Sequence, residues 1–188
     1  MGCEMALQLQ GQRPTHLFLQ AGVGAMAGAM AGFFADLYGA DCPAITVVEP
    51  QEADCLFQTA SAKDGALHKT GGSMETIMAG LCCGEPCGVG WEQLRAHAGS
   101  YAAISDAVAA RGMCILGSPL PGDLRVISGE SGAATVGFLA AAAEDPALRE
   151  RLGLDETSRV LCISTEGDTD RENYRRIVWE GAFSQRGE

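Results

Sequence analysis

The sequence predicts an α/β fold in which an open, mostly parallel sheet is flanked by helices. Short apolar runs that suit buried strands lie at residues 15–20, 44–48 and 159–164. A segment with helical character follows each of the first two runs, and the order strand, helix, strand, helix makes neighbouring strands parallel. Glycine-rich or polar residues follow the strands, as at the ligand-binding edge of such sheets.

The first two strand–helix units account for the N-terminal third of the chain. Residues 15–20 form an apolar run that enters a glycine cluster, and residues 25–38 are rich in Ala and Met and end at Gly39. A β-branched strand at 44–48 then precedes a helix at 53–62. Apolar runs of this length, bounded by Gly and Pro, are typical of buried strands and their crossover helices.

The remaining elements follow a loop-rich segment that begins at residue 65. Helices are predicted at 74–81, 91–98, 106–116, 132–152 and 171–180, and a third strand at 159–164. The long helix is interrupted near Pro146, because proline suits the first turn of a new helix. Residues 1–14 are expected to be an N-terminal helix or remnant, and residues 15–188 to belong to one catalytic domain.

Composition excludes several classes of partner. The chain has 13 Lys and Arg against 24 Asp and Glu, a net charge of −11, so neither nucleic acid nor an anionic membrane surface is expected to bind. No apolar run reaches the ~18–20 residues of a membrane-spanning helix. The first residues include Glu4 and no basic segment, so we expect a cytoplasmic protein without a signal peptide.

The eight cysteines are expected to be thiols in that compartment. Cys82, Cys83 and Cys87 form the densest group, but no second cysteine pair or paired histidine completes a zinc site. The three histidines are isolated along the chain, and each is expected to be structural or at the surface.

The segment between the first strand and its helix, residues 20–28, predicts a phosphate site. Glycines let backbone N–H groups turn toward an anion at the positive end of a helix. Gly22, Gly24 and Ala27 also fit a dinucleotide fingerprint, and Glu49 stands where a ribose-binding acid would. An NAD(P)-dependent oxidoreductase with a Rossmann-type domain is therefore an alternative, and close helix–strand packing without a ligand is another.

Two further polar segments lie at element ends. Residues 128–133 precede an alanine-rich helix, where Ser131 is expected to act as the N-cap. Residues 164–170 close a buried strand with a long polar run. In an open α/β sheet such strand ends line the ligand crevice.

Six stretches together resemble the C-terminal half of the diaminopropionate ammonia-lyase family. They are residues 19–28, 48–55, 76–86, 127–133, 163–170 and 178–181, and the likeness runs from about residue 15 to residue 181. That family is similar to the serine and threonine dehydratases. The resemblance implies an incomplete version of the large domain of fold type II, or tryptophan synthase beta-like, pyridoxal phosphate enzymes.

The resemblance also implies a reaction and a set of binding residues. The reaction is a β-elimination that converts 2,3-diaminopropionate, a small amino-acid substrate, to pyruvate and ammonia with pyridoxal 5′-phosphate as cofactor. The residues that would offer backbone N–H groups to the cofactor phosphate are Gly22, Val23, Gly24, Ala25 and Met26. Ser164 or Thr165 would face the pyridine nitrogen.

A weaker implication of the resemblance concerns a cation. In related dehydratases and racemases, the positions of Glu49 and the Ala53 carbonyl help to hold a metal ion. Cys55 stands where an oxygen ligand would be needed, which is a departure from that pattern.

The lysine that forms the Schiff base lies in the N-terminal half of this family, so no catalytic residue is expected in this chain. Lys63 and Lys69 lie outside the family's lysine context and are expected at the surface. We therefore expect a fragment that is inactive alone and works in a homodimer of the full-length enzyme or with a separate N-terminal half. A serine or threonine dehydratase-like protein and a non-catalytic remnant are the remaining alternatives.

Overall fold

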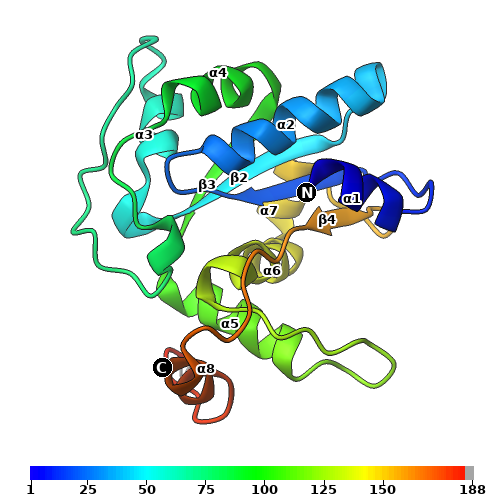
Figure 1. The fold of residues 1–188 in the computed structure, drawn as a ribbon, viewed down its shortest axis with the longest axis vertical. Coiled ribbons are helices and arrows are strands. Elements are labelled where there is room, and N and C mark those ends of the chain that lie inside the picture. The colour runs from blue at the N-terminus through cyan, green and yellow to red at the C-terminus, as the bar shows by residue number, and fades with distance from the viewer. Residues whose placement is uncertain (185–188) are drawn as a thin grey trace.

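A four-stranded parallel sheet forms the centre of the chain in a computed structural model, which describes residues 1–184 (Figure 1). The strands are β1 (His16–Gln20), β2 (Ala44–Pro50), β3 (Ala98–Ile104) and β4 (Val160–Cys162). Their order across the sheet is β3-β2-β1-β4, and every neighbouring pair is parallel. All five residues of β1 are buried, as expected of an inner strand with helices on both faces.

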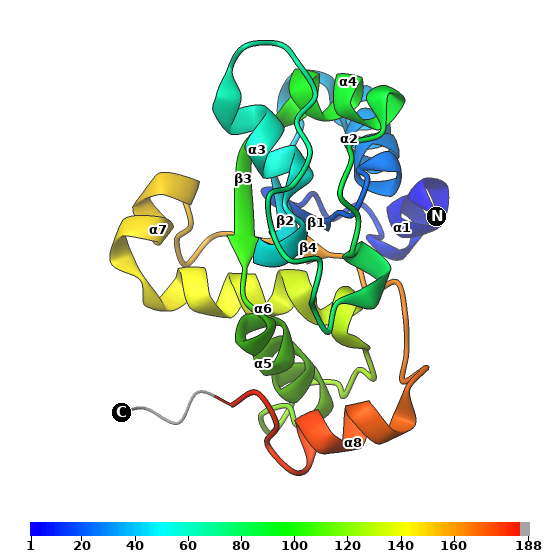
Figure 2. The same ribbon diagram turned by 90° about the vertical axis from the view of Figure 1, so that its left-hand side faces the viewer.

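The helices form a layer on each face of this sheet. Their bounds are α1 Gly2–Gln8, α2 Ala25–Tyr38, α3 Cys55–Ala62, α4 Gly88–His97, α5 Asp106–Gly117, α6 Glu130–Glu144, α7 Pro146–Leu152 and α8 Arg171–Val178. Short 3₁₀ turns cover Gly39–Asp41, Gln51–Ala53 and Ala79–Leu81. Figure 2 shows α2, α3 and α4 on one side of the sheet, α6 on the other, and α5 and α8 farther out on that side.

The side chains of β1 divide the core between the two layers, because successive residues of a strand point to opposite faces. Leu17 and Leu19 pack with Phe34 of α2 and Leu56 of α3. Phe18 points the other way and contacts the cluster of α6, where its ring lies 5.4 Å from that of Phe138.

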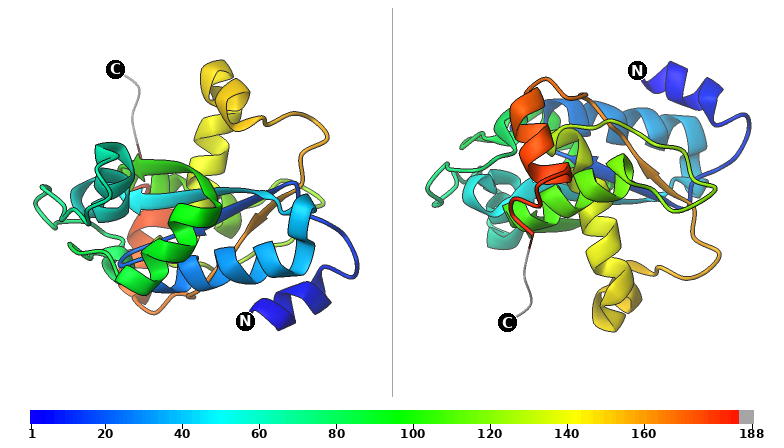
Figure 3. Two further views of the ribbon diagram at one scale, coloured as in Figure 1. Left: turned by 90° about the horizontal axis from the view of Figure 1, so that it is seen from above. Right: turned by 90° about the horizontal axis from the view of Figure 1, so that it is seen from below.

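Glycines allow helices to approach one another closely at a few points. A Cβ on Gly28 of α2 would lie 2.5 Å from the carbonyl oxygen of Gly90 in α4. Gly137 of α6 faces the Val108 carbonyl of α5 in the same way. At the N-terminus, Gly2 lies against the ring of Phe33, so that α1 rests beside α2 (Figure 3). These three contacts leave no room for a side chain at the glycine positions.

Several predicted elements are confirmed. The structure has the predicted helix at Ala25–Tyr38, and a helix break at Asp145 and Pro146 separates α6 from α7. The third predicted strand is shorter than expected, spanning Val160–Cys162, and the terminal helix ends at Val178. Asp145 accepts hydrogen bonds from the Ala147 and Leu148 N–H groups and so caps α7.

One predicted helix is wrong, and one strand was not predicted. The helix predicted at 74–81 is absent except for the 3₁₀ turn Ala79–Leu81. Met74 has a φ of 62° and donates its backbone N–H to the Glu52 carbonyl, which ties this segment to another loop. Strand β3, which follows α4 directly and pairs with β2, was not predicted from the sequence. None of the described helices is long and apolar enough to span a membrane.

Candidate functional site

Six of the seven residues predicted to bind the cofactor, all except Ser164, lie around one cavity of about 430 Å³ at the carboxyl ends of β1 and β4. Its wall is made by residues 20–27, together with Met1, Gly80, Leu81, Cys83, Ser131, Thr165 and Glu166. The loop after β1 and the first turn of α2 form one side, and the chain after β4 forms another. The cavity therefore has the position at which open parallel sheets bind their ligands.

The glycine loop presents backbone N–H groups without partners. Gly24 is the N-cap of α2 with a φ of 87°, a conformation that favours glycine. Among the described residues, the N–H groups of residues 22–27 donate no hydrogen bond. The first N–H groups of a helix need external acceptors and carry partial positive charge, so an anion is stabilised here.

The shape of the loop suits a compact ligand held by the backbone. A Cβ on Gly22 would lie 3.0 Å from Cys83 Sγ and 3.2 Å from the Leu81 carbonyl oxygen. A Cβ on Gly24 would lie 3.0 Å from Leu56 Cδ1. Glu166 supplies the charged side chain in the described wall, and no Lys or Arg side chain reaches it. A phosphate in this cavity would be held by N–H groups and the dipole of α2.

The opposite part of the wall presents a hydroxyl. Thr165 lines the cavity and its Oγ1 accepts a hydrogen bond of 3.1 Å from Gln20 Nε2. Ser164 lies outside the wall, and its hydroxyl donates to Ser128 Oγ at 2.8 Å. Of the two residues predicted to face a ring nitrogen, Thr165 is therefore the one in contact with the cavity.

Gln20 itself is fully buried at the end of β1. Its Nε2 also donates to the Ile163 carbonyl at 2.7 Å, which fixes the orientation of the amide. The other amide atom, Oε1, is buried and has no partner among the described residues. An unpartnered buried acceptor is uncommon and is often found where function constrains a side chain.

Glu166 connects the cavity to the start of α6. Its Oε1 accepts backbone N–H bonds from Ser131 at 2.6 Å and from Gly132 at 3.2 Å. The prediction that Ser131 caps this helix is wrong, because the N-cap is Gly129 and Ser131 Oγ instead accepts the Gly80 N–H at 3.1 Å. The carboxylate takes the capping role across the cavity wall.

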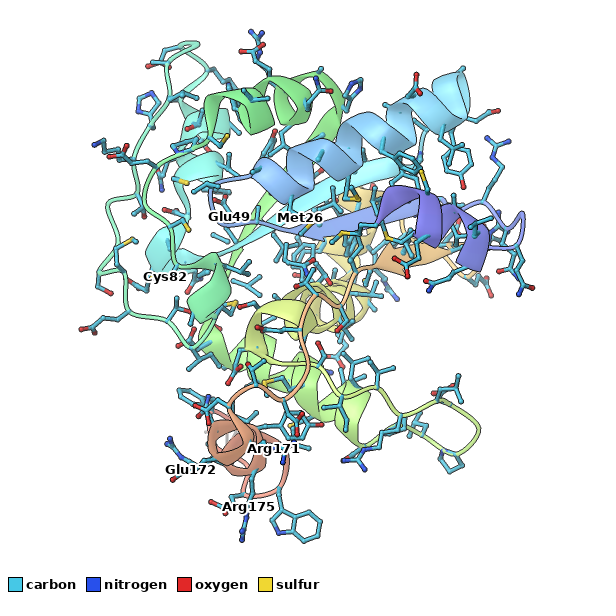
Figure 4. All side chains as sticks on the ribbon, in the orientation of Figure 1. Met26, Glu49, Cys82, Arg171, Glu172 and Arg175 are labelled. Atoms are coloured by element: carbon cyan, nitrogen blue, oxygen red, sulfur yellow. The ribbon has the colours of Figure 1, made fainter. Side chains whose placement is uncertain are left out.

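Glu49, predicted as a metal or ribose ligand, lies beside the start of α3 and not in the cavity wall (Figure 4). It is fully buried, and its two oxygens accept the Leu56 N–H at 2.9 Å and the Phe57 N–H at 2.7 Å. Burial raises the pKa of this carboxyl to about 8, although the two backbone bonds favour the charged form. Ala53 is buried in the preceding turn. Within residues 1–184, no group of three or more His, Cys, Asp or Glu side chains is arranged to hold a metal ion.

Both lysines lie away from the cavity. Lys63 is exposed at the end of α3 with a φ of 54°, and Lys69 is exposed and forms an ion pair with Glu85. All eight cysteines are free thiols in the structure. Cys83 lines the cavity, whereas Cys82, labelled in Figure 4, donates to the Met74 carbonyl at 3.1 Å.

Gln20 and Glu166 lie in segments that were expected at the ligand edge, but no role was predicted for either side chain, and Cys83 and Ser131 were not expected in the wall. Gln20 carried a usable signal, because it is the polar end of an otherwise apolar strand that enters the glycine loop. The others come from distant parts of the chain, and only the fold brings them together.

Comparisons with known proteins agree on one family. Residues 1–166 match the family described as pyridoxal-phosphate dependent enzyme. Diaminopropionate ammonia-lyase of Escherichia coli (strain K12) is 50% identical over 174 residues, which cover 91% of this chain and 43% of that protein. The chain therefore spans less than half the length of this curated relative.

Solved structures give the same result. The crystal structure of Escherichia coli diaminopropionate ammonia lyase in complex with an aminoacrylate-PLP azomethine reaction intermediate has a TM-score of 0.89 and 45% identity, covering 97% of this chain and 47% of that chain. Threonine deaminase isoform 2 from Solanum lycopersicum has a TM-score of 0.74 at 18% identity, and the match covers 96% of this chain and 48% of the deaminase chain. That likeness shows the fold alone.

Proposed function

The chain belongs to the family of pyridoxal-phosphate dependent enzymes, and from that premise we propose that it forms the cofactor-binding part of a diaminopropionate ammonia-lyase. The observation that carries the proposal is the joining, in one cavity, of the free N–H groups after β1 and the Thr165 hydroxyl after β4. The predicted fold type II architecture is confirmed by the solved relatives.

Each part of the cavity has a role in this proposal. Residues 22–26 would hold the phosphate through their backbone N–H groups, and Thr165 would hold the ring nitrogen. When bound, pyridoxal phosphate supplies an electron-withdrawing ring that stabilises negative charge at the α carbon of an amino acid. The buried layer of β1 and the loop around Leu81 would keep water from one side of that ring.

The proposed reaction is the β-elimination of 2,3-diaminopropionate to pyruvate and ammonia. Support comes from the 50% identity to a protein that bears this name, and the NAD(P)-dependent alternative is not favoured. The position of Glu49 also argues against an NAD(P)-binding site. Both of its carboxylate oxygens accept hydrogen bonds from the start of α3, outside the cavity, so the side chain does not face a bound ribose there.

The lysine of the reaction would come from a polypeptide that corresponds to the N-terminal part of the relatives. The positions of Lys63 and Lys69 away from the cavity support this part of the proposal. Assembly as a homodimer of the longer enzyme, or with a separate N-terminal half, and a cytoplasmic location belong to the same proposal.

The test combines this chain with the N-terminal part of the Escherichia coli relative that precedes the matched region, produced in the same cells. We expect pyruvate to form from 2,3-diaminopropionate with both polypeptides and not with either alone. L-Serine and L-threonine in parallel assays separate this activity from that of a dehydratase. Rapid turnover by this chain alone, or faster turnover of serine or threonine by the pair, would overturn the proposal.

A further inference from the structure

We propose that Gln20 is a positioning residue that makes the Thr165 hydroxyl a hydrogen-bond donor toward the ring nitrogen of the bound cofactor. The inference rests on the proposed function and adds a residue to it. Gln20 lies in the same cavity wall as Thr165, but its amide is aimed at the hydroxyl and not at the ligand.

The orientation of the Gln20 amide follows from its neighbours. The Ile163 carbonyl oxygen can only accept, so the amide atom 2.7 Å from it must be Nε2. The same nitrogen lies 3.1 Å from Thr165 Oγ1 and has a second proton to give. Both protons of the amide are thereby used, one on a backbone carbonyl and one on the hydroxyl.

This arrangement leaves the proton of Thr165 without an acceptor among the described residues, so the hydroxyl is free to donate to a ligand. A hydroxyl can donate once and accept twice, and here an acceptor position is taken by Gln20. Thr165 Oγ1 donates no hydrogen bond to any of the described residues. If a protonated ring nitrogen also donated to this oxygen, the hydroxyl proton would remain unpaired. The arrangement therefore favours an unprotonated ring nitrogen that accepts from Thr165.

The buried Oε1 of Gln20 indicates that the orientation is imposed by the site. Reversing the amide would place Oε1 against the Ile163 carbonyl, where two acceptors would repel each other. The amide instead keeps Oε1 unpartnered at a fully buried position. Such an unsatisfied atom calls for an explanation, and the second donor to Thr165 provides one.

Other titratable groups around the cavity are few. Glu166 and Cys83 are the titratable side chains in the described wall, and Met1 contributes the amino terminus. Glu166 is held by the Ser131 and Gly132 N–H groups at α6, so its carboxylate is engaged apart from the Gln20–Thr165 pair. The state of a ring nitrogen beside Thr165 therefore reports mainly on that pair.

The test uses 4′-deoxypyridoxine 5′-phosphate, which has the cofactor's ring and phosphate but no aldehyde and needs no lysine. Ultraviolet absorption of the probe, bound to the chain and titrated with acid, gives the apparent pKa of its ring nitrogen. We expect that pKa to be lower on the unsubstituted chain than in free solution. In Gln20→Met we expect it to rise toward the free value, with affinity about tenfold weaker.

Thr165→Val and the double variant show whether Gln20 acts through the hydroxyl. Thr165 is exposed, so its replacement should leave folding intact and should raise the ring-nitrogen pKa as Gln20→Met does. Adding Gln20→Met to Thr165→Val should change the pKa no further, because coupled residues are not additive. Thr165→Ser keeps a hydroxyl and should retain the low pKa. Gln12→Met, at an exposed glutamine, is the matched control.

The outcomes distinguish this inference from the proposed function. Failure of the unsubstituted chain to bind the probe would overturn both. Binding with a ring nitrogen that titrates as in free solution, or an unchanged pKa in folded Gln20→Met, would overturn only the role of Gln20. If Gln20→Met does not fold, a Thr165→Val pKa equal to that of the unsubstituted chain overturns the inference equally.

Discussion

At the residue scale, Glu49 binds the N-terminus of a helix, although its position in the sequence suggests a ligand-binding role. It lies next to the last residue of β2, as a ribose-binding or metal-binding acid would, but its two oxygens accept from N–H groups in the first turn of α3. A carboxylate at a helix N-terminus is favoured by the helix dipole, and burial opposes its charge. The net effect is a pKa of about 8.

A pH dependence of stability follows from Glu49. The folded state keeps a proton that the unfolded state, with a pKa near the ordinary 4.5, releases, so this group's contribution falls as the pH rises from about 4.5 to about 8. We expect Glu49→Gln to be less stable than the unsubstituted chain by about 1–3 kcal/mol at pH 5. Between pH 5 and pH 8 its free energy of unfolding should fall less than that of the unsubstituted chain. Urea unfolding at several pH values measures both effects. Equal pH slopes for Glu49→Gln and the unsubstituted chain would contradict this account, and exposed Glu75→Gln is the control.

Gly24 provides a second prediction at this scale. Its φ of 87° and the nearness of Leu56 and Leu94 leave an alanine both strained and crowded. We expect Gly24→Ala to destabilise the fold by about 1–3 kcal/mol and to weaken binding of pyridoxal phosphate, because the loop's N–H groups would be displaced. Thermal unfolding and a fluorescence titration measure the two effects.

Gly39→Ala is the matched control for Gly24. Gly39 also has a positive φ, of 55°, but a Cβ there would meet no atom within 4 Å, and it lies at the far end of α2. Gly39→Ala should be less stable than the unsubstituted chain but should bind pyridoxal phosphate with the same affinity. Equal affinities for the two variants would show that the loop does not hold the phosphate.

At the scale of elements, the helix pair α2 and α4 depends on close backbone contact. Gly28→Ala would place Cβ 2.5 Å from the Gly90 carbonyl oxygen, and backbone cannot move as a flexible side chain can. We expect Gly28→Ala to lower the free energy of unfolding, measured with urea, by about 1–3 kcal/mol. Gly88→Ala, at the start of α4 with nothing within 4 Å, should be neutral or slightly stabilising. A neutral Gly28→Ala would show that this crossing is looser than described.

The elements also show how far sequence reasoning reaches. Strands β1 and β2 and helix α2 were predictable because their hydrophobic patterns agree with their burial. Strand β3, Ala98–Ile104, consists mostly of Ala, Gly and Ser, which have little strand propensity, and pairing with β2 makes it a strand. The helix predicted at 74–81 does not form because the Met74 N–H donates to the Glu52 carbonyl, which lies in another loop.

In the candidate site, too, some residues could be predicted from the sequence and others could not. The glycine loop and Thr165 were predictable, since each follows an apolar strand and parallel strands end at one edge. The choice of Thr165 over Ser164 was not, because it depends on which hydroxyl is taken by Ser128. The bonds of Glu166 to α6 and of Gln20 to Thr165 join residues 35 and 145 positions apart. Such pairings are consequences of the fold and leave no local pattern.

At the scale of the whole molecule, the cavity at the carboxyl ends of β1 and β4 is lined by neither Lys63 nor Lys69. It corresponds to 43% of the length of the curated relative and matches nearly all of its own length to solved structures of that enzyme. The sheet has β4, of three residues, along one side of β1. These facts support the proposal that this chain would bind the phosphate and the ring, while another polypeptide segment would supply the lysine.

Borohydride treatment of the chain with pyridoxal phosphate, followed by mass spectrometric mapping, tests this central claim most directly. Borohydride fixes any covalent link between the cofactor and a lysine, and the absorption spectrum of the mixture follows binding. We predict saturable binding without stoichiometric labelling of Lys63 or Lys69, and a labelled lysine on the N-terminal polypeptide when it is supplied. Stoichiometric labelling of Lys63 or Lys69 in the chain alone, or no binding at all, would contradict the account.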